Sequence, residues 1–114
     1  MGYKFLHVGV PTTQVRPNEV YVEKMKLYKI GPEHSEFNIE YLRFQDGTPF
    51  PEVMHFNPHV AYEVDCIEEA AKGAKVIVEP IELPDCTICF IIKDNVIYEL
   101  LQPKKDSTAQ GQSY

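Results

Sequence analysis

Two histidines and two glutamates stand out because each lies inside a segment that is otherwise apolar or aromatic. In chain order they are His7, Glu40, His59 and Glu99, so a histidine segment is followed by a glutamate segment twice. Each histidine precedes by two positions a residue with little or no side chain, Gly9 or Ala61, which leaves room for an approaching group. A carboxylate inside an apolar strand is costly unless it is paired or bound to a metal. We therefore expect the four side chains to satisfy one another through a single divalent cation.

The chemistry of these four side chains limits which ion they would bind. Two neutral imidazoles and two carboxylates suit Ni, Co, Fe, Mn or Zn, and they suit Cu(I) or a structural thiolate zinc poorly. Four protein ligands leave one or two positions on a five- or six-coordinate ion, which can hold substrate oxygens. Glu99 or Glu40 could leave the ion and carry a proton as general base, so both are candidate catalytic residues. A metal-free scaffold, in which the four side chains hydrogen-bond to one another, is the other possibility.

The remaining histidines and cysteines fit a metal site less well. His55 precedes His59 by four residues, but the intervening Asn-Pro excludes the helix that would make the two a ligand pair. Cys86 and Cys89 have the spacing of a redox or zinc pair, yet residues three apart in a strand face opposite ways. We interpret all three as residues outside the site.

The apolar pattern predicts a series of short strands and one helix. Pro49, Pro51 and Pro58 predict an irregular linker over 46–58, which would separate two modules. Short turns at 31–35 and 94–95 predict two hairpins. The predicted strands are 5–10, 26–30, 37–44, 58–64, 75–79, 87–92 and 96–101.

The helix is predicted over 66–72. Asp65 is a good N-cap, Glu68 occupies the capping-box position, and Gly73 is suited to end the helix. Pro80 is expected to break the strand that follows.

Composition limits the class of protein. A chain of 114 residues predicts a single domain over 1–102, with modules about 3–45 and 58–102, and a disordered tail over 103–114. A formal net charge of −6 argues against a nucleic-acid partner. No apolar run approaches the roughly 20 residues of a membrane helix. Three cysteines do not make a disulfide framework, so we expect a reducing cytoplasm. A homodimer is expected because short open sheets often pair across an interface.

The segments around the four residues resemble the vicinal oxygen chelate superfamily, which includes glyoxalase I, methylmalonyl-CoA epimerase, extradiol dioxygenases and the fosfomycin and bleomycin resistance proteins. The likeness covers residues 3–102. It is carried by His7-Val-Gly-Val, Ile39-Glu40-Tyr-Leu, Pro58-His59-Val-Ala-Tyr-Glu-Val-Asp and Val96-Ile-Tyr-Glu99-Leu-Leu. The resemblance implies an α+β fold of two βαβββ modules that form a curved mixed sheet around a metal cleft. It also implies that His7 and Glu40 are ligands from the first module, and that His59 and Glu99 are ligands from the second.

The first module departs from the family pattern. A longer helix with a Phe-Tyr pair usually follows the first strand, and here only the proline-interrupted 11–26 occupies that place. The departure argues against glyoxalase I activity itself and for a more open cleft or another substrate.

The resemblance implies a divalent-metal-dependent lyase or isomerase that acts on a small oxygen-bearing substrate through an enediolate-like intermediate. A dioxygenase is less natural, because its Fe(II) site needs two histidines and one carboxylate. The alternative from another class is a non-catalytic protein of the same fold that binds and sequesters a small molecule. Its stacking surfaces would be Tyr41, Phe44, Phe50 and Tyr98.

Overall fold

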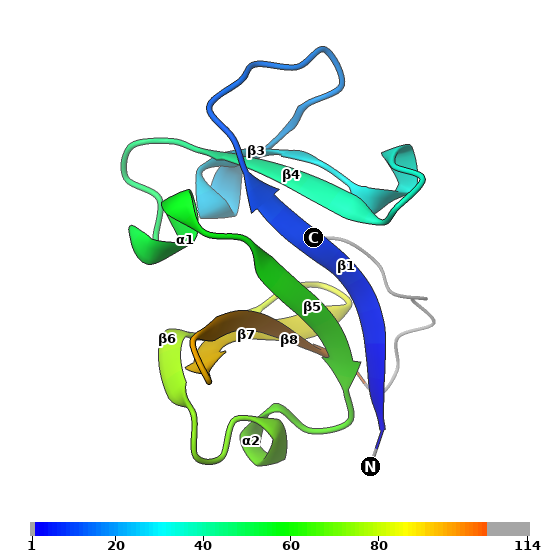
Figure 1. Ribbon diagram of the computed structural model, residues 1–114, viewed down its shortest axis with the longest axis vertical. Helices are drawn as coiled ribbons and strands as arrows, with labels where there is room; N and C mark the ends of the chain where they lie inside the picture. The colour runs from blue at the N-terminus through cyan, green and yellow to red at the C-terminus, as the bar shows by residue number, and fades with distance from the viewer. Residues whose placement is uncertain (1, 105–114) are drawn as a thin grey trace. The chain divides into compact units, whose positions relative to one another are not determined.

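The computed structural model describes residues 2–104, in which eight strands form one mixed sheet accompanied by a few short helices (Figure 1). The strands are β1 (Tyr3–Pro11), β2 (Val20–Val22), β3 (Leu27–Ile30), β4 (Ile39–Phe44), β5 (His59–Val64), β6 (Lys75–Glu82), β7 (Cys86–Lys93) and β8 (Val96–Pro103). The helices are α1 (Val53–Phe56), α2 (Ile67–Ala70) and the 3-10 turns η1 (Glu23–Met25) and η2 (Pro32–His34). The predicted α+β class with a mixed sheet is confirmed.

The strands are ordered β2-β3-β4-β1-β5-β8-β7-β6 in the sheet. Contacts divide the chain into an N-terminal unit, His7–His59, and a C-terminal unit that holds the described residues on either side of that range. The single domain with modules about 3–45 and 58–102 stays a prediction. None of the helices within residues 2–104 has the length and apolar character needed to cross a bilayer.

In the N-terminal unit, β1 runs parallel to β4, and β4 pairs antiparallel with β3. The hairpin predicted for residues 26–44 is thus confirmed, with η2 in its connection. The register pairs Gly9 with Glu40, and it pairs Lys29 with Leu42. Paired residues on neighbouring strands share a face of the sheet. Side chains of β1, β3 and β4 therefore point to the same face.

The linker over 46–58 is predicted to be irregular, and this prediction is wrong because the segment contains α1. The prolines flank the helix instead of interrupting it, since Pro51 precedes α1 and Pro58 follows it. Met54 is 1% exposed, which gives the segment an apolar anchor in the N-terminal unit. His55 therefore lies in a helical turn and not in an irregular linker.

One ion pair fastens the loop before β2 to the sheet. Arg43 of β4 donates hydrogen bonds from Nε and Nη2 to the two carboxylate oxygens of Glu19, both at 2.7 Å. The guanidinium also lies over the ring of Tyr28, 4.2 Å from its centre. These hydrogen bonds hold the pKa of Glu19 below its usual range.

Glu19→Gln is expected to change how stability depends on pH. A carboxylate whose folded pKa is lowered adds stability above its unfolded pKa of about 4.3, and this stability is lost as the pH falls through the lower folded value. The urea midpoint of Glu19→Gln should therefore lie roughly 0.3 M below that of the parent at neutral pH, and the difference should shrink towards pH ~3. Glu36→Gln, at an exposed glutamate, is the control. A difference that stays constant over this pH range would contradict the expectation.

In the C-terminal unit, α2 packs against one side of the strands and forms a small core with them. The core consists of Val64, Ile67, Ala70, Cys89, Ile91 and Leu100, with Tyr62 and Tyr98 packed against it. The helix is shorter than the predicted 66–72, and Gly73 follows its last turn with φ 77°.

The predicted capping of this helix is wrong. Cys66, not Asp65, is the N-cap, and no side chain caps the helix locally. The N–H of Ile67 instead donates to Oε1 of Gln102 at 2.8 Å, a residue of β8. The side-chain amide of Gln102, distant in sequence, therefore satisfies a backbone N–H at the start of the helix in place of the expected capping box.

The predicted break at Pro80 is also wrong, because β6 continues through it to Glu82. β6 lies at one end of the strand order, where a missing backbone N–H need not interrupt a ladder. The pairing with β7 shifts between Val78 and Ile81, so the proline sits at an irregularity in the strand.

The start of the predicted tail needs correction. Pro103 still belongs to β8, and the N–H of Lys104 donates to the carbonyl of Asp85 at 3.0 Å. The rest of the predicted tail, 105–114, lies outside the residues that the structure describes.

The turn at Asp94-Asn95 is confirmed, and it offers a test of stability. Lys93 pairs with Val96, and the two turn residues have φ 52° and 67°. Positive φ is unfavourable for residues with a Cβ, and Asp-Gly is a preferred sequence for such two-residue hairpins. Asn95→Gly should raise the free energy of unfolding by about 0.5–1 kcal/mol, and Asn95→Ala should lower it by a similar amount. Thermal unfolding of the three proteins measures this, and equal midpoints would refute it.

Candidate metal centre

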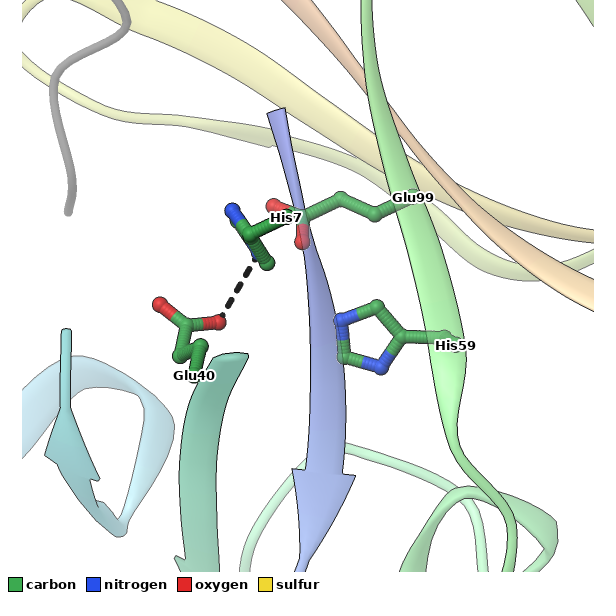
Figure 2. Close-up of side chains that lie close together, drawn as sticks. All are labelled: His7, Glu40, His59 and Glu99. Carbon is green, nitrogen blue, oxygen red and sulfur yellow. Dashed lines mark ion pairs between the residues drawn. The ribbon is translucent and has the colours of Figure 1, made fainter. Parts of the chain in front are cut away.

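His7, Glu40, His59 and Glu99 each offer one metal-ligand atom, and these atoms all lie within 4.8 Å of one another. Figure 2 shows the four side chains turned towards one another. The side chains are buried, and Glu40 and Glu99 are 0% exposed. The structure thus brings together all four residues that the sequence singles out, in a buried cluster that could hold a metal ion. That they bind a metal stays a prediction.

His7 and Glu40 form a close pair within the cluster. Nε2 of His7 lies 3.0 Å from Oε1 of Glu40, marked by the dashed line in Figure 2. The strand register explains the pairing, because Glu40 sits beside Gly9 and His7 is two residues earlier on the same face of β1.

His59 reaches the cluster by packing its ring against the backbone of Gly9. A Cβ built on Gly9 would overlap this ring, and even Nδ1, the third nearest atom, would be only 2.8 Å away. The rings of His59 and His7 lie edge to face, with centres 6.2 Å apart. The room expected beside the first histidine is therefore real, and the second histidine fills it.

Glu99 is directed to the cluster by the alternation of β8. Its neighbours Tyr98 and Leu100 belong to the core that α2 covers. Glu99 must therefore point to the opposite face of β8, where it is 0% exposed. A single-residue shift in register would exchange these faces, so the apolar core on one side fixes the carboxylate on the other.

Lys29 belongs to this site, and the sequence analysis missed it. Its Nζ lies 3.7 Å from Oε2 of Glu40, and the residue is only 6% exposed. The usable signal was that Lys29 alternates with Leu27, which is 1% exposed, so both occupy the buried face of β3. Tyr28 and Ile30, which alternate with these two residues, are only half-buried.

The distances between the four ligand atoms fit a single divalent ion. Ligand atoms about 2.1 Å from one ion are roughly 3.0 Å apart at right angles and roughly 4.2 Å apart when opposite. The His7–Glu40 separation of 3.0 Å matches the first value, and the outer limit of 4.8 Å exceeds the second only slightly. Donor type and spacing therefore suit the predicted ions.

The other two histidines lie elsewhere, as predicted for His55. His34 is exposed, with its Nε2 3.6 Å from Glu33. His55 stacks on the ring of Phe44 with centres 4.5 Å apart, and its Nε2 lies 3.0 Å from the carbonyl oxygen of Phe50. Both rings are engaged away from the cluster.

The cysteines show no sign of acting as thiolate ligands. All three are free, and Cys86 and Cys89 are buried. Burial raises the pKa of both thiols, which keeps them protonated at neutral pH. This agrees with the interpretation that the CxxC spacing carries no function.

The aromatic residues expected to stack on a bound molecule are occupied by protein contacts. Tyr41 and Tyr98 alternate with the buried glutamates and so face away from them. The guanidinium of Arg16 covers Tyr41, 4.1 Å from its ring centre, and Phe50 is 4% exposed. Phe44 packs on Phe50 as well as on His55.

Comparisons with known proteins identify a shared fold. No protein-family model matches the chain, and no curated protein matches it significantly. The chain is similar to the crystal structure of the hypothetical protein BH1468 from Bacillus halodurans C-125, with a TM-score of 0.63 and 19% sequence identity. The match covers 96% of this chain and 100% of that one. At this identity the likeness shows the fold alone.

Proposed function

We propose that the protein is a glyoxalase-like, divalent-metal-dependent lyase or isomerase of the vicinal oxygen chelate superfamily. Its substrate would be a small oxygen-bearing molecule that reacts through an enediolate-like intermediate. The observation that carries the proposal is the buried cluster of two imidazoles and two carboxylates, with ligand atoms within 4.8 Å of one another. The ion, one of Ni, Co, Fe, Mn or Zn, would supply Lewis-acid polarisation of a substrate carbonyl. The proposal includes the two βαβββ modules, the first with a reduced helix.

The residues themselves would move the proton. A carboxylate that accepts a proton from the carbon beside a carbonyl must be within reach of that carbon and shielded from bulk water. Glu40 and Glu99 meet the second condition, since both are 0% exposed. Nε2 of His7 and Nζ of Lys29 lie near the two oxygens of Glu40, at 3.0 and 3.7 Å. Either glutamate would then return the proton to the neighbouring atom, completing an isomerisation or elimination.

The proposal extends to the setting in which the protein works. Three free cysteines suit a reducing cytoplasm. A homodimer is proposed because β2 and β6 end the strand order and expose Val20, Tyr21 and Val76. Light scattering during gel filtration measures the mass, and a monomer at micromolar concentration would refute the dimer.

Two other functions are possible for this cluster, and the exchange experiment described below distinguishes them from the enzyme. A binding protein of the same fold would take up a metal and a ligand without turnover. A metal-free scaffold would rely on the contacts of Glu40 with His7 and Lys29.

The test uses protein purified without a polyhistidine tag, loaded with each of the five metals and placed in D2O with hydroxyacetone or hydroxypyruvate. Proton NMR follows exchange at the hydroxymethyl carbon, where an enediolate would form. Metal-dependent exchange that Glu99→Gln and Glu40→Gln abolish, and that the exposed Glu68→Gln leaves intact, supports the enzyme. Metal and ligand binding without exchange supports the binding protein. No uptake of any metal contradicts both.

A further inference from the structure

We propose that the ligand of this centre is a small organic anion, and that the ammonium of Lys29 selects it. The inference rests on the proposed metal centre and adds the charge of the substrate. It assigns to Lys29 a role in specificity, separate from metal binding.

The charges of the buried groups favour an anionic ligand. Among the described residues, the buried polar or charged side chains are His7, Lys29, Glu40, His59 and Glu99. With neutral imidazoles, the two carboxylates balance a divalent ion, and Lys29 adds one positive charge. A buried excess charge is strongly unfavourable unless an opposite charge accompanies it. An anionic ligand bound beside the ion would bring the opposite charge close to both the ion and Lys29.

Lys29 lies where its ammonium can contact a bound anion. The residue comes from β3, a strand that provides none of the four ligands, and its Nζ approaches Oε2 of Glu40 at 3.7 Å. Oε1 of the same carboxylate faces His7 at 3.0 Å. The ammonium thus lies beside the cluster without being a possible ligand, since a protonated lysine has no lone pair.

Metal binding alone disfavours a lysine at position 29, because its charge repels a cation. Lys29 occupies a face that it shares with Leu27 and Leu42, both nearly fully buried. An apolar residue would fill this place without repelling a cation. The lysine is explained when the bound molecule carries a carboxylate, as a 2-oxo or 2-hydroxy acid does, because an ammonium and a metal ion then share its charge.

The experiment compares two probes of similar size, pyruvate and the neutral diketone diacetyl. The untagged protein is loaded with Co(II), and each probe is titrated while the visible absorption of the cobalt is recorded. The variants are Lys29→Met, which keeps the chain length and removes the charge, and Lys29→Arg, which keeps the charge. Lys75→Met, at an exposed lysine of β6, is the matched control.

We expect Lys29→Met to bind Co(II) at least as tightly as the parent, because a repelling charge is gone. Its affinity for pyruvate should fall at least tenfold, its affinity for diacetyl should not change, and Lys29→Arg should recover most of the loss. Unchanged pyruvate binding in Lys29→Met overturns the inference and leaves the metal centre standing. A folded Lys29→Met that no longer binds Co(II) also overturns it, because Lys29 would then hold Glu40 in place. A parent that binds no Co(II) removes the metal centre and the inference together. The parent provides a test even if the variants do not fold, since equal affinity for the two probes overturns the inference.

Discussion

Gly9→Ala is expected to disable the metal centre although it changes none of the four ligands. The new methyl group would overlap the ring of His59, which is 1% exposed and so cannot turn away into solvent. Either the ring or β1 must shift, and overpacking of this kind costs about 1–3 kcal/mol of stability. A shift of about 1 Å in one ligand breaks the common geometry that a metal needs.

The affinity for Co(II), measured by competition with a chromophoric chelator, should fall at least a hundredfold in Gly9→Ala. Gly2→Ala is the matched control, because a Cβ at Gly2 meets nothing within 4 Å. Urea unfolding separates the two effects of the substitution, since the variant should remain folded in dilute buffer. Parental affinity for Co(II) in a folded Gly9→Ala would show that His59 is not a ligand.

The candidate site was largely readable from sequence because its members break a strong local rule. Glutamate and histidine inside apolar strands must be satisfied somewhere, and the fixed alternation of strands decides on which face. Tyr98 and Leu100, which flank Glu99 in the strand, pack in the core. The side chain of Glu99 must therefore point to the opposite face. Residues in short hairpins, such as Asp94-Asn95, are equally predictable because the turn is determined locally.

The errors occurred where a distant residue overrides the local signal. The amide of Gln102 satisfies the N–H of Ile67, so Asp65 is not needed as a cap. Pro80 is tolerated because β6 lies at one end of the strand order, which its own sequence does not reveal. The helix α1 buries Met54, which is 1% exposed, and this burial is not apparent from the proline-rich local sequence.

Lys29 was missed for a related reason. Which face of β3 is buried depends on its pairing with β4, where Lys29 is beside Leu42 and so on the face of Glu40. Four residues of strand carry too little pattern to decide between two alternations. Tertiary pairing, not propensity, places the lysine.

Glu40→Gln is expected to abolish metal binding and, separately, to destabilise the metal-free protein. The amide keeps the shape of the side chain, but it removes one of the two negative charges that balance the ion, so the affinity for Co(II) should fall at least a hundredfold. It also removes the negative charge beside the buried ammonium of Lys29, 3.7 Å away. Breaking one side of such a buried pair costs about 3 kcal/mol.

A double variant separates these two effects. Glu40→Gln combined with Lys29→Met removes both charges, so urea unfolding of the metal-free protein should recover most of the stability lost in Glu40→Gln alone. Co(II) binding should not recover, because the carboxylate ligand is still missing. Glu36→Gln, at an exposed glutamate outside the cluster, controls for the loss of a carboxylate. If the double variant regains Co(II) binding, Glu40 acts only as the partner of Lys29, and the metal would have to be held by the other three residues.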